Sequence, residues 1–196
     1  SGIVEAFGKL VEQGYVYHGL KPVHWCPSCE TALAEAEVEY FDSSTPTVFV
    51  KFPVKKETLP QEKLSSRKTN IIIWTTTPWT LPANVAVCLH PKFNYFAVKP
   101  VGIDEYWIMV DELIIPNFKK FGLQVEEKVP LEKSTLEKIL CDHPFLEREI
   151  RTVFDDYVTL DTGTGIVHIA PGHGDEDYVI GMRYQLPVIS PVNHQG

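Results

Sequence analysis

The chain has 196 residues, of which 44% are apolar and 11% aromatic, and its formal net charge is −8. This composition is typical of a globular domain with a hydrophobic core and excludes an intrinsically disordered chain. Apolar runs such as residues 71–74 are far shorter than the roughly 18 residues that a membrane span needs. We therefore expect no membrane partner.

The acidic balance argues against a free-standing nucleic-acid-binding protein, because such proteins usually present a basic face. The basic residues are scattered, so affinity for RNA has to come mostly from another part of a longer protein. The start at Ser1 and Gly2, without methionine, also indicates a segment of a longer protein. Four cysteines with uneven spacing are too few for a disulfide scaffold, and they favour a reducing, cytoplasmic compartment.

The N-terminal part predicts a connecting segment at residues 1–42, followed by a core domain at 43–196. Apolar residues at helical spacing predict a helix over residues 3–20, and alternating apolar and acidic residues predict a strand over 34–40. Between them, Cys26 and Cys29 form half of a zinc knuckle. No second CxxC follows, so we expect no metal in this chain; a redox CxxC is the alternative. A turn-rich linker at 42–46 sets the boundary.

Beyond the linker, β-branched and aromatic runs predict strands at 48–52, 70–75, 85–89, 95–99, 106–110 and 166–169. Helices are predicted at 111–121, 135–140 and 175–184, with Asp175 as the N-cap of the last one. The polar residues 60–68 read as a mobile loop. Many strands with few helices between them predict an α+β fold: a mixed, strongly curved, barrel-like sheet with a few peripheral helices, and not a doubly wound one.

Residues 75–84, TTTPWTLPAN, follow an apolar strand and turn at two prolines. Consecutive threonines at a strand end place hydroxyls on both faces of the chain, where they can bind a ribose, a carbonyl or a water. The alternative is that threonine simply favours strands and proline favours turns.

Residues 161–177 bring glycines, two histidines and several carboxylates into two neighbouring loops. Amides beside glycine can bind a carbonyl or an oxyanion, and a carboxylate can hold an ammonium group. A metal site built from histidine and aspartate is the competing interpretation, although no HExxH-type spacing supports it. In a purely structural interpretation, Asp175 caps a helix and the neighbouring carboxylates interact favourably with the helix dipole.

Taken together, these segments resemble the editing domains of isoleucyl-tRNA synthetases, and the resemblance covers almost the whole chain. It is carried by residues 21–26, 32–40, 75–84 and 163–178. Thr77 and Trp79 favour the isoleucyl enzymes over the leucyl and valyl ones, which carry an arginine and an acidic residue at these places. The resemblance implies an ester hydrolase that removes valine from misacylated tRNA(Ile), and that acts on valyl-adenylate as a further substrate.

The physical need for such a site is plain. One methylene gives a binding pocket only about 1–3 kcal/mol of discrimination, and the isoleucine–valine pair is the usual illustration of this limit. A second site that admits valine, excludes isoleucine and hydrolyses the ester supplies the missing accuracy. The resemblance implies as partners the valine-bearing 3′ end of tRNA(Ile) and the rest of the synthetase with its Rossmann catalytic domain, and a monomer. The resemblance also implies that the zinc site begun by Cys26 and Cys29 is completed only in the full-length enzyme, by residues outside this chain.

The resemblance also assigns roles. Asp177 holds the α-ammonium, Thr76 and Thr77 position the amino acid with the ribose or water, and His168 limits the size of the pocket. His168 is also a candidate general base, although a wall residue serves equally well. The remaining candidates for substrate binding are Trp74, Thr75, Thr80, Asn84, Gly172 and His173. A non-catalytic tRNA-docking insertion and a metal-dependent hydrolase are the competing functions.

Overall fold

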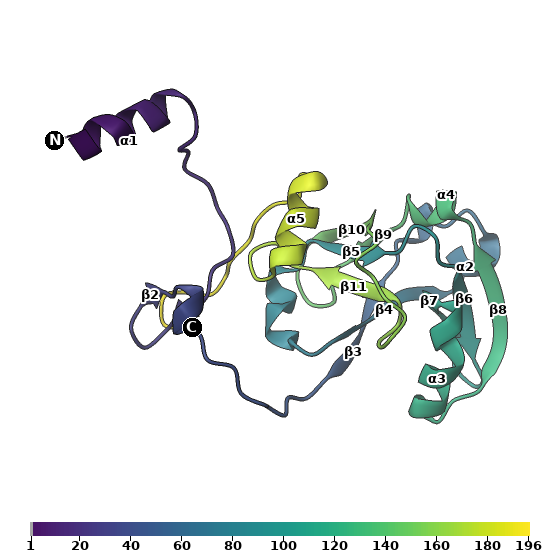
Figure 1. Cartoon of the computed structure of the whole chain (residues 1–196). Helices are drawn as coiled ribbons and strands as arrows, with labels where there is room; N and C mark the ends of the chain where they lie inside the picture. Colours follow the sequence, from purple (N-terminus) through teal and green to yellow (C-terminus); the bar gives the residue numbers. More distant parts are fainter. Residues whose placement is uncertain (1) are drawn as a thin grey trace.

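Two β-sheets make up the body of the chain in the computed structural model, which describes residues 2–196 (Figure 1). Ser1, cited above as an indication of a longer protein, lies outside the described residues. The larger sheet has the order β3-β4-β7-β6-β8 and the smaller one the order β11-β5-β10-β9. The larger sheet contains Val48–Pro53 (β3), Lys68–Thr75 (β4), Tyr95–Pro100 (β6), Glu105–Val110 (β7) and Val125–Leu131 (β8). The smaller contains Ala86–Leu89 (β5), Leu140–Asp142 (β9), Glu149–Phe154 (β10) and Ile166–Ile169 (β11).

The helices are short and lie around the sheets. The α-helices are Gly2–Glu12 (α1), Glu62–Ser65 (α2), Asp111–Phe121 (α3), Lys133–Leu136 (α4) and Asp175–Arg183 (α5). Three 3₁₀ helices span Glu35–Glu37 (η1), Lys56–Thr58 (η2) and Pro78–Ala83 (η3) in the described chain. None of the helices described is both long and apolar enough to cross a membrane.

The mixed α+β prediction is confirmed, because parallel and antiparallel strands occur together. β4 pairs with β7, and β5 with β10, in parallel, while the other neighbours are antiparallel. A single bridge between Val54 and Cys141 links the two sheets at one edge. No closed barrel forms within residues 2–196, so the barrel-like part of the prediction is not confirmed.

The main hydrophobic core lies where the two sheets face each other. It includes Ile71 and Ile73 from the larger sheet and Val87 and Ile150 from the smaller one, all fully buried. β4 is buried along nearly its whole length, as expected for a strand covered on both faces. The end of this strand carries the threonine run, so the core fixes where that run begins.

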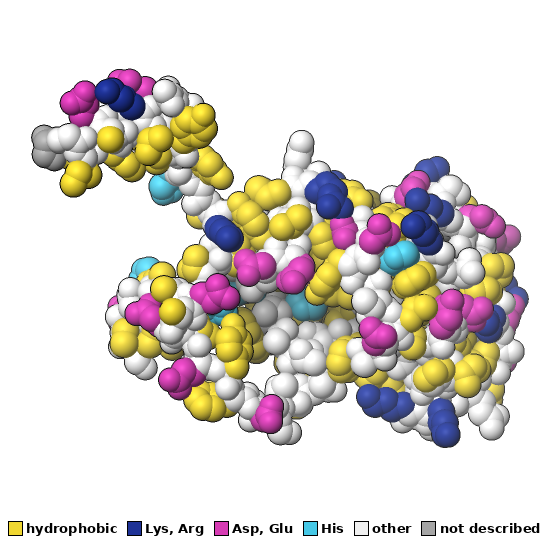
Figure 2. All heavy atoms as spheres, viewed as in Figure 1, with side chains coloured by type: hydrophobic (Ala, Val, Ile, Leu, Met, Phe, Trp, Pro, Cys, Tyr) yellow, Lys and Arg dark blue, Asp and Glu magenta, His cyan; other side chains and the backbone are white. Residues whose placement is uncertain are grey.

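α1 and the two-stranded knuckle, Trp25–Cys26 (β1) with Thr31–Ala32 (β2), stand apart from the two sheets (Figure 1). Figure 2 shows apolar side chains gathered along one side of this isolated helix. They are Ile3, Val4, Phe7, Leu10 and Val11, and all of them are exposed or half-exposed. The helix was predicted to reach residue 20 but ends at Glu12, because Gly14 takes a left-handed conformation with φ 78°. The predicted boundary at residue 42 stays a prediction.

The strand predicted over 34–40 is wrong: the segment contains η1 instead. The Glu37 carboxylate accepts a hydrogen bond from the Ala34 amide at 2.8 Å, which closes a tight local turn. An alternating pattern forms a strand only where a partner strand is within reach, and among the described residues none pairs with this segment.

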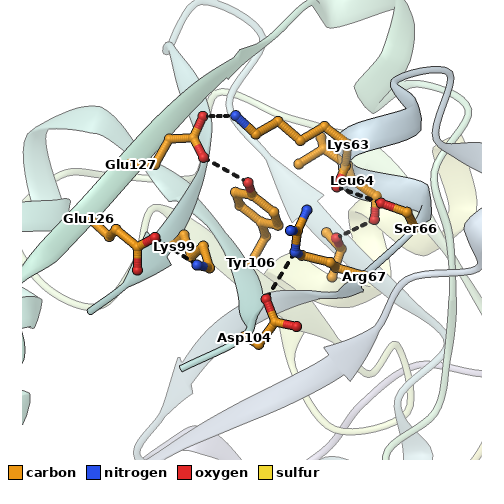
Figure 3. A network of polar contacts seen from close by, with 10 residues as sticks. Lys63, Leu64, Ser66, Arg67, Lys99, Asp104, Tyr106, Glu126 and Glu127 are labelled. Carbon is orange, nitrogen blue, oxygen red and sulfur yellow. Dashed lines mark hydrogen bonds and ion pairs between the residues drawn. The ribbon is translucent and has the colours of Figure 1, made fainter. Parts of the chain in front are cut away.

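The polar segment 60–68 contains the short helix α2, so the loop prediction is wrong. Leu64 is fully buried, and the Thr69 hydroxyl donates a hydrogen bond to its carbonyl at 3.0 Å. Figure 3 shows how the helix is tied to the larger sheet: Lys63 pairs with Glu127 of β8, which also accepts a hydrogen bond from the buried Tyr106 at 2.9 Å. The contacts come from strands distant in sequence, which a local pattern does not reveal.

Candidate functional site

A cavity of about 430 Å³ opens between the end of β4, η3, the turn before β11 and the start of α5. It is lined by residues 74–77, 79, 80, 157, 159, 162–168, 173, 174, 176 and 177. Its wall therefore combines the threonine run with both glycine-bearing loops. Segments about 90 residues apart in the sequence meet here because β4 and β11 lie side by side in the folded chain (Figure 1).

The three consecutive threonines do different things. The Thr75 hydroxyl is buried and accepts a hydrogen bond from the Thr77 amide at 3.0 Å, so it shapes the turn out of β4. The Thr77 carbonyl accepts hydrogen bonds from the Thr80 amide and hydroxyl, at 3.1 and 2.8 Å, which starts η3. The side chains of Thr76 and Thr77 lie on the exposed side of this wall. The Thr77 hydroxyl lies 3.3 Å from the Thr75 hydroxyl, so of the three hydroxyls that of Thr76 is the one without a partner among the described residues.

His168 lies on β11 and is 6% exposed. Its Nε2 is 3.1 Å from the Thr80 hydroxyl, and its Nδ1 is 3.5 Å from the Asn84 side-chain nitrogen. Since the Thr80 hydroxyl already donates to a carbonyl, it has to accept from His168, which places the ring proton on Nε2. The Nδ1 lone pair then faces the Asn84 amide. Burial, with His143 and His173 nearby, lowers the pKa of His168 to about 4, so the ring is neutral at pH 7.

Asp177 lies in the first turn of α5, and one of its carboxylate oxygens, Oδ2, accepts a hydrogen bond from the Ala170 amide at 2.8 Å. Burial raises the pKa of this carboxyl, and the Glu176 charge acts in the same direction, while the Ala170 hydrogen bond opposes them. Gly174 makes room for this arrangement, because a Cβ there would stand 3.2 Å from Asp177 Cγ. The other carboxylate oxygen, Oδ1, is left to receive a cation.

The turn before β11 supplies the floor of the cavity. Gly163 and Gly165 both have positive φ, 80° and 73°. A Cβ on Gly165 would lie 2.4 Å from a methyl of Val110, and one on Gly163 would lie 3.3 Å from the Trp74 ring. Thr164 between them donates a hydrogen bond to the Ile72 carbonyl at 2.6 Å. The glycines therefore let this turn lie flat against β4 and β7.

Comparison with known proteins agrees with this geometry. Residues 1–139 match the family model described as tRNA synthetases class I (I, L, M and V). The chain belongs to the class I tRNA synthetase family. Among curated proteins it is 46% identical to an isoleucine–tRNA ligase of Desulforamulus reducens and 50% identical to one of Petrotoga mobilis. These matches cover 98% and 99% of this chain but 20% of each relative, so the chain spans about one fifth of their length.

Two solved structures show where in such a synthetase this fold occurs. The editing domain of the Plasmodium knowlesi cytosolic leucyl-tRNA synthetase matches with a TM-score of 0.55 and 13% identity, over 75% of this chain and 68% of that one. The crystal structure of GlLeuRS-CP1 matches with a TM-score of 0.54 and 18% identity, over 72% and 66%. At these identities the likeness concerns the fold. The chain is thus a class I synthetase segment with the fold of a synthetase editing domain.

Most residues predicted from the sequence of this synthetase segment lie at the cavity. Those that line it are Trp74, Thr75, Thr76, Thr77, Thr80, His168, His173 and Asp177. Asn84 does not line the cavity: it is fully buried behind His168 and donates hydrogen bonds to the Ala86 and Ile169 carbonyls. Gly172 does not line it either, since its Cα packs so closely on the Ile189 carbonyl that a Cβ would lie 2.2 Å away. The N-cap of α5 is Gly174, so the prediction of Asp175 as the cap is wrong.

Sequence reasoning missed several lining residues of this synthetase cavity. Tyr157 and Thr159 belong to the loop after β10, a strand that was not predicted, and Glu176 was considered only for its effect on the helix dipole. No Lys or Arg is found among the lining residues that the structure describes. The carboxyl groups of Glu176 and Asp177 are thus the acidic groups in this lining, which suits a cationic ligand group.

Metal binding has weak support in this part of the synthetase. The Cys29 amide donates to Cys26 Sγ at 3.4 Å, and this contact lowers the pKa of the Cys26 thiol. Across residues 2–196, no three His, Cys, Asp or Glu side chains are grouped so that they could hold a metal ion. Two thiolates are half of a structural zinc site, so these residues alone do not fit zinc. The same finding removes support from the His–Asp metal site considered above.

Proposed function

We propose that this chain is the editing domain of an isoleucine–tRNA ligase and that it hydrolyses the ester of valyl-tRNA(Ile). The observation that carries the proposal is a carboxylate, Asp177, placed in a cavity that also holds the threonine hydroxyls and lacks cationic side chains among its described lining residues. An aminoacyl ester matches this wall, because its α-ammonium is positive and its ester oxygens accept hydrogen bonds from hydroxyls.

The substrate would be seated by three contacts. Its ammonium pairs with Asp177 Oδ1, the oxygen that the Ala170 amide leaves free. The ester and the terminal ribose lie against Thr76 and Thr77, on the open side of the threonine wall. His168 sets the limit on side-chain size, because its ring is buried and its Nε2 is held by the Thr80 hydroxyl. Valine fits and isoleucine, with one more methylene, is excluded.

Hydrolysis then needs a water molecule held beside the ester carbonyl. The water oxygen forms a bond to the carbonyl carbon, the bond to the ribose oxygen breaks, and the ribose oxygen takes up the proton, giving valine and free tRNA. His168 is unsuited to remove the proton from water, because its Nε2 carries a proton and its lone pair faces Asn84. We assign the orientation of the water to the threonine hydroxyls, with help from the neighbouring ribose hydroxyl of the tRNA.

The rest of the synthetase has to deliver the tRNA 3′ end. The chain itself carries a charge of −8, so the phosphates find few partners here. We propose that the domain acts as part of a monomeric, cytoplasmic enzyme whose Rossmann domain makes the ester that this cavity removes. Valyl-adenylate is proposed as a second substrate.

The test is calorimetric binding of a non-hydrolysable valyl-amino-adenosine to the chain, with the isoleucyl analogue as its matched control. We expect the valyl analogue to bind and the isoleucyl analogue to be excluded. Equal binding of both would overturn the size filter. Binding of neither would contradict the editing site and favour the non-catalytic docking function. Hydrolysis of valyl-tRNA(Ile) that is insensitive to a chelator would dispose of the metal-dependent alternative.

A further inference from the structure

The wall of the cavity that carries Thr80 is held from behind by the turn between β9 and β10, residues 143–148. η3 ends at Ala83 with an extended Asn84, whose amide donates a hydrogen bond to the Leu81 carbonyl at 2.9 Å. Two side chains of the turn donate further hydrogen bonds to carbonyls at this end of the helix. His143 Nε2 donates to the Leu81 carbonyl at 2.9 Å. Arg148 Nη1 donates to the Pro82 and Asn84 carbonyls at 2.9 and 2.6 Å.

Hydrogen bonds within the turn fix its conformation. His143 is 4% exposed, and its Nδ1 accepts hydrogen bonds from the Phe145 and Leu146 amides at 3.3 and 3.2 Å. These contacts fix its tautomer, because a nitrogen that accepts carries no proton and the other one has to donate. The His143 amide donates to the Arg148 carbonyl at 2.9 Å, which closes the loop. The side chains of His143 and Arg148 are therefore held in the orientation in which they contact η3.

The segment that these hydrogen bonds hold, η3 with Asn84, also carries the side chains that lie against the His168 ring. Thr80 precedes Leu81 and accepts the His168 ring proton, while Asn84 faces the opposite ring nitrogen. A shift of the segment by a few tenths of an ångström would change both contacts, since each depends on distance and direction. No acidic side chain pairs with Arg148 in the part of the chain that the structure describes, so its charge is directed at the carbonyls.

We infer that His143 and Arg148 are positioning residues for the His168 wall: they clamp the carbonyl end of η3 and so hold Thr80 and Asn84 in register with the imidazole. The inference rests on the proposed function for its effect on substrates, but its structural part is independent of it. Neither residue lines the cavity. Their effect on the site therefore passes through η3.

The test compares Arg148→Ala with Arg67→Ala. Arg67 pairs with Asp104 beside the larger sheet and does not line the cavity, so the control removes a guanidinium of the same charge elsewhere in the fold. The first measurement is the pair of ¹⁵N resonances of His168, which distinguish a protonated ring nitrogen from one with a lone pair. The second is the affinity for the non-hydrolysable valyl-amino-adenosine.

In Arg148→Ala we expect the two His168 resonances to move toward each other, as the tautomer preference is lost, and the valyl affinity to fall about tenfold. Arg67→Ala should leave both unchanged, and Arg148→Lys, which keeps a cationic donor, should recover part of each. Wild-type resonances and affinity in Arg148→Ala would overturn the inference, as would equal effects in the control.

Two further arms keep the test decisive. If Arg148→Ala does not fold, Arg148→Met takes its place, because it keeps the aliphatic part of the side chain but has no donor for the carbonyls; wild-type resonances in that variant overturn the inference. If the unsubstituted chain binds neither analogue, the proposed function fails, and the His168 resonances alone decide whether the clamp positions the ring.

Discussion

Burial acts in opposite directions on the pKa values of two side chains that line the cavity. It lowers that of His168 to about 4 and raises that of Asp177, and in both cases the neutral form gains. The consequences differ, because the proposed role of His168 needs a neutral ring and that of Asp177 needs a charge. Burial destabilises the ionised Asp177 carboxylate. The ammonium group of a bound substrate would offset part of this loss.

Replacing Asp177 by asparagine is expected to separate binding from stability. The folded chain holds the Asp177 proton more tightly than the unfolded chain, so ionisation with rising pH costs stability, and the uncharged variant escapes this cost. At pH 8 we expect Asp177→Asn to be at least as stable as the original chain in urea, while the valyl-amino-adenosine affinity falls at least tenfold. Asp175→Asn, in the same helical turn but exposed, is the control. Unchanged affinity would refute the ammonium contact.

His168 predicts a loss of stability in mild acid. Its pKa is about 6.5 unfolded and about 4 folded, so the unfolded chain binds a proton in this window that the folded chain does not. The stability is complete above pH 6.5 and falls as the pH drops toward 4, by at most about 1.4 kcal/mol per pH unit from this group. Urea unfolding at pH 5 and 7 measures the slope. His168→Gln should reduce it and exposed His18→Gln should not; equal slopes in all three chains would contradict this account.

The size filter gives a second test of His168. Truncation to alanine removes the ring that stands between Thr80 and Asn84 and leaves space at the wall. We expect His168→Ala to bind the isoleucyl-amino-adenosine that the original chain excludes, as measured by calorimetry. Continued exclusion would place the filter elsewhere along the cavity.

Among the elements, the glycine turn before β11 is tied to four others by hydrogen bonds. Thr164 bonds to β4, and its carbonyl accepts from the Val110 amide of β7 at 3.0 Å. Asn117 of α3 donates to the Gly163 carbonyl at 2.8 Å, and the Tyr95 hydroxyl of β6 donates to the Gly165 carbonyl at 2.7 Å. The turn thus joins the larger sheet, α3 and the cavity floor. A side chain added here has to displace β7.

Gly165→Ala is expected to be more harmful than Gly122→Ala. Both glycines have a similar positive φ, 73° and 68°, so both variants bear the roughly 1 kcal/mol cost of a left-handed alanine. Only Gly165 adds a collision, with Val110, whereas no atom lies within 4 Å of a Cβ on Gly122 among the described residues. Overpacking should add about 1–3 kcal/mol. Equal changes in unfolding free energy would show that β7 yields without cost.

At the scale of the whole molecule, the net charge bears on how the proposed tRNA substrate is bound. The chain is acidic, and no cation is found among the described residues of the cavity wall. The apolar face of α1 stands clear of the two sheets (Figure 2). In the proposed function, recognition of the tRNA body therefore lies largely outside this chain.

This division predicts different salt responses for two ligands. For tRNA without an attached amino acid, the dissociation constant of the complex with this chain should be micromolar or higher. It should rise further as the salt concentration increases from about 50 to 200 mM. Valyl-amino-adenosine should bind almost equally at both concentrations, because its contact with a largely buried carboxylate is poorly screened. Filter binding and calorimetry measure the two. Submicromolar tRNA binding by the chain alone would contradict this division.

Local sequence patterns predicted what local physics controls. The buried strands β4, β5, β6, β7 and β11 are runs of β-branched and aromatic residues, and α3 lies at its predicted bounds. The threonine run and the glycine–histidine–carboxylate loop were recognised because their residue types are unusual for structure alone. Most of the predicted site residues meet at one cavity.

The remaining features were decided only in the tertiary structure. β10 begins with alternating charged and apolar residues that carry a weak local signal, and it becomes a strand because β5 and β9 flank it. Because β10 and the turn before it were not predicted, neither the place of Tyr157 in the cavity nor the hydrogen bonds from Arg148 to η3 could be foreseen. Hydrogen bonds to carbonyls some 60 residues away leave no trace in local composition, because any backbone offers the same carbonyl. The sequence by itself therefore determined which kinds of side chain gather at the candidate site, and the packing of distant strands decided which side chains hold them in place.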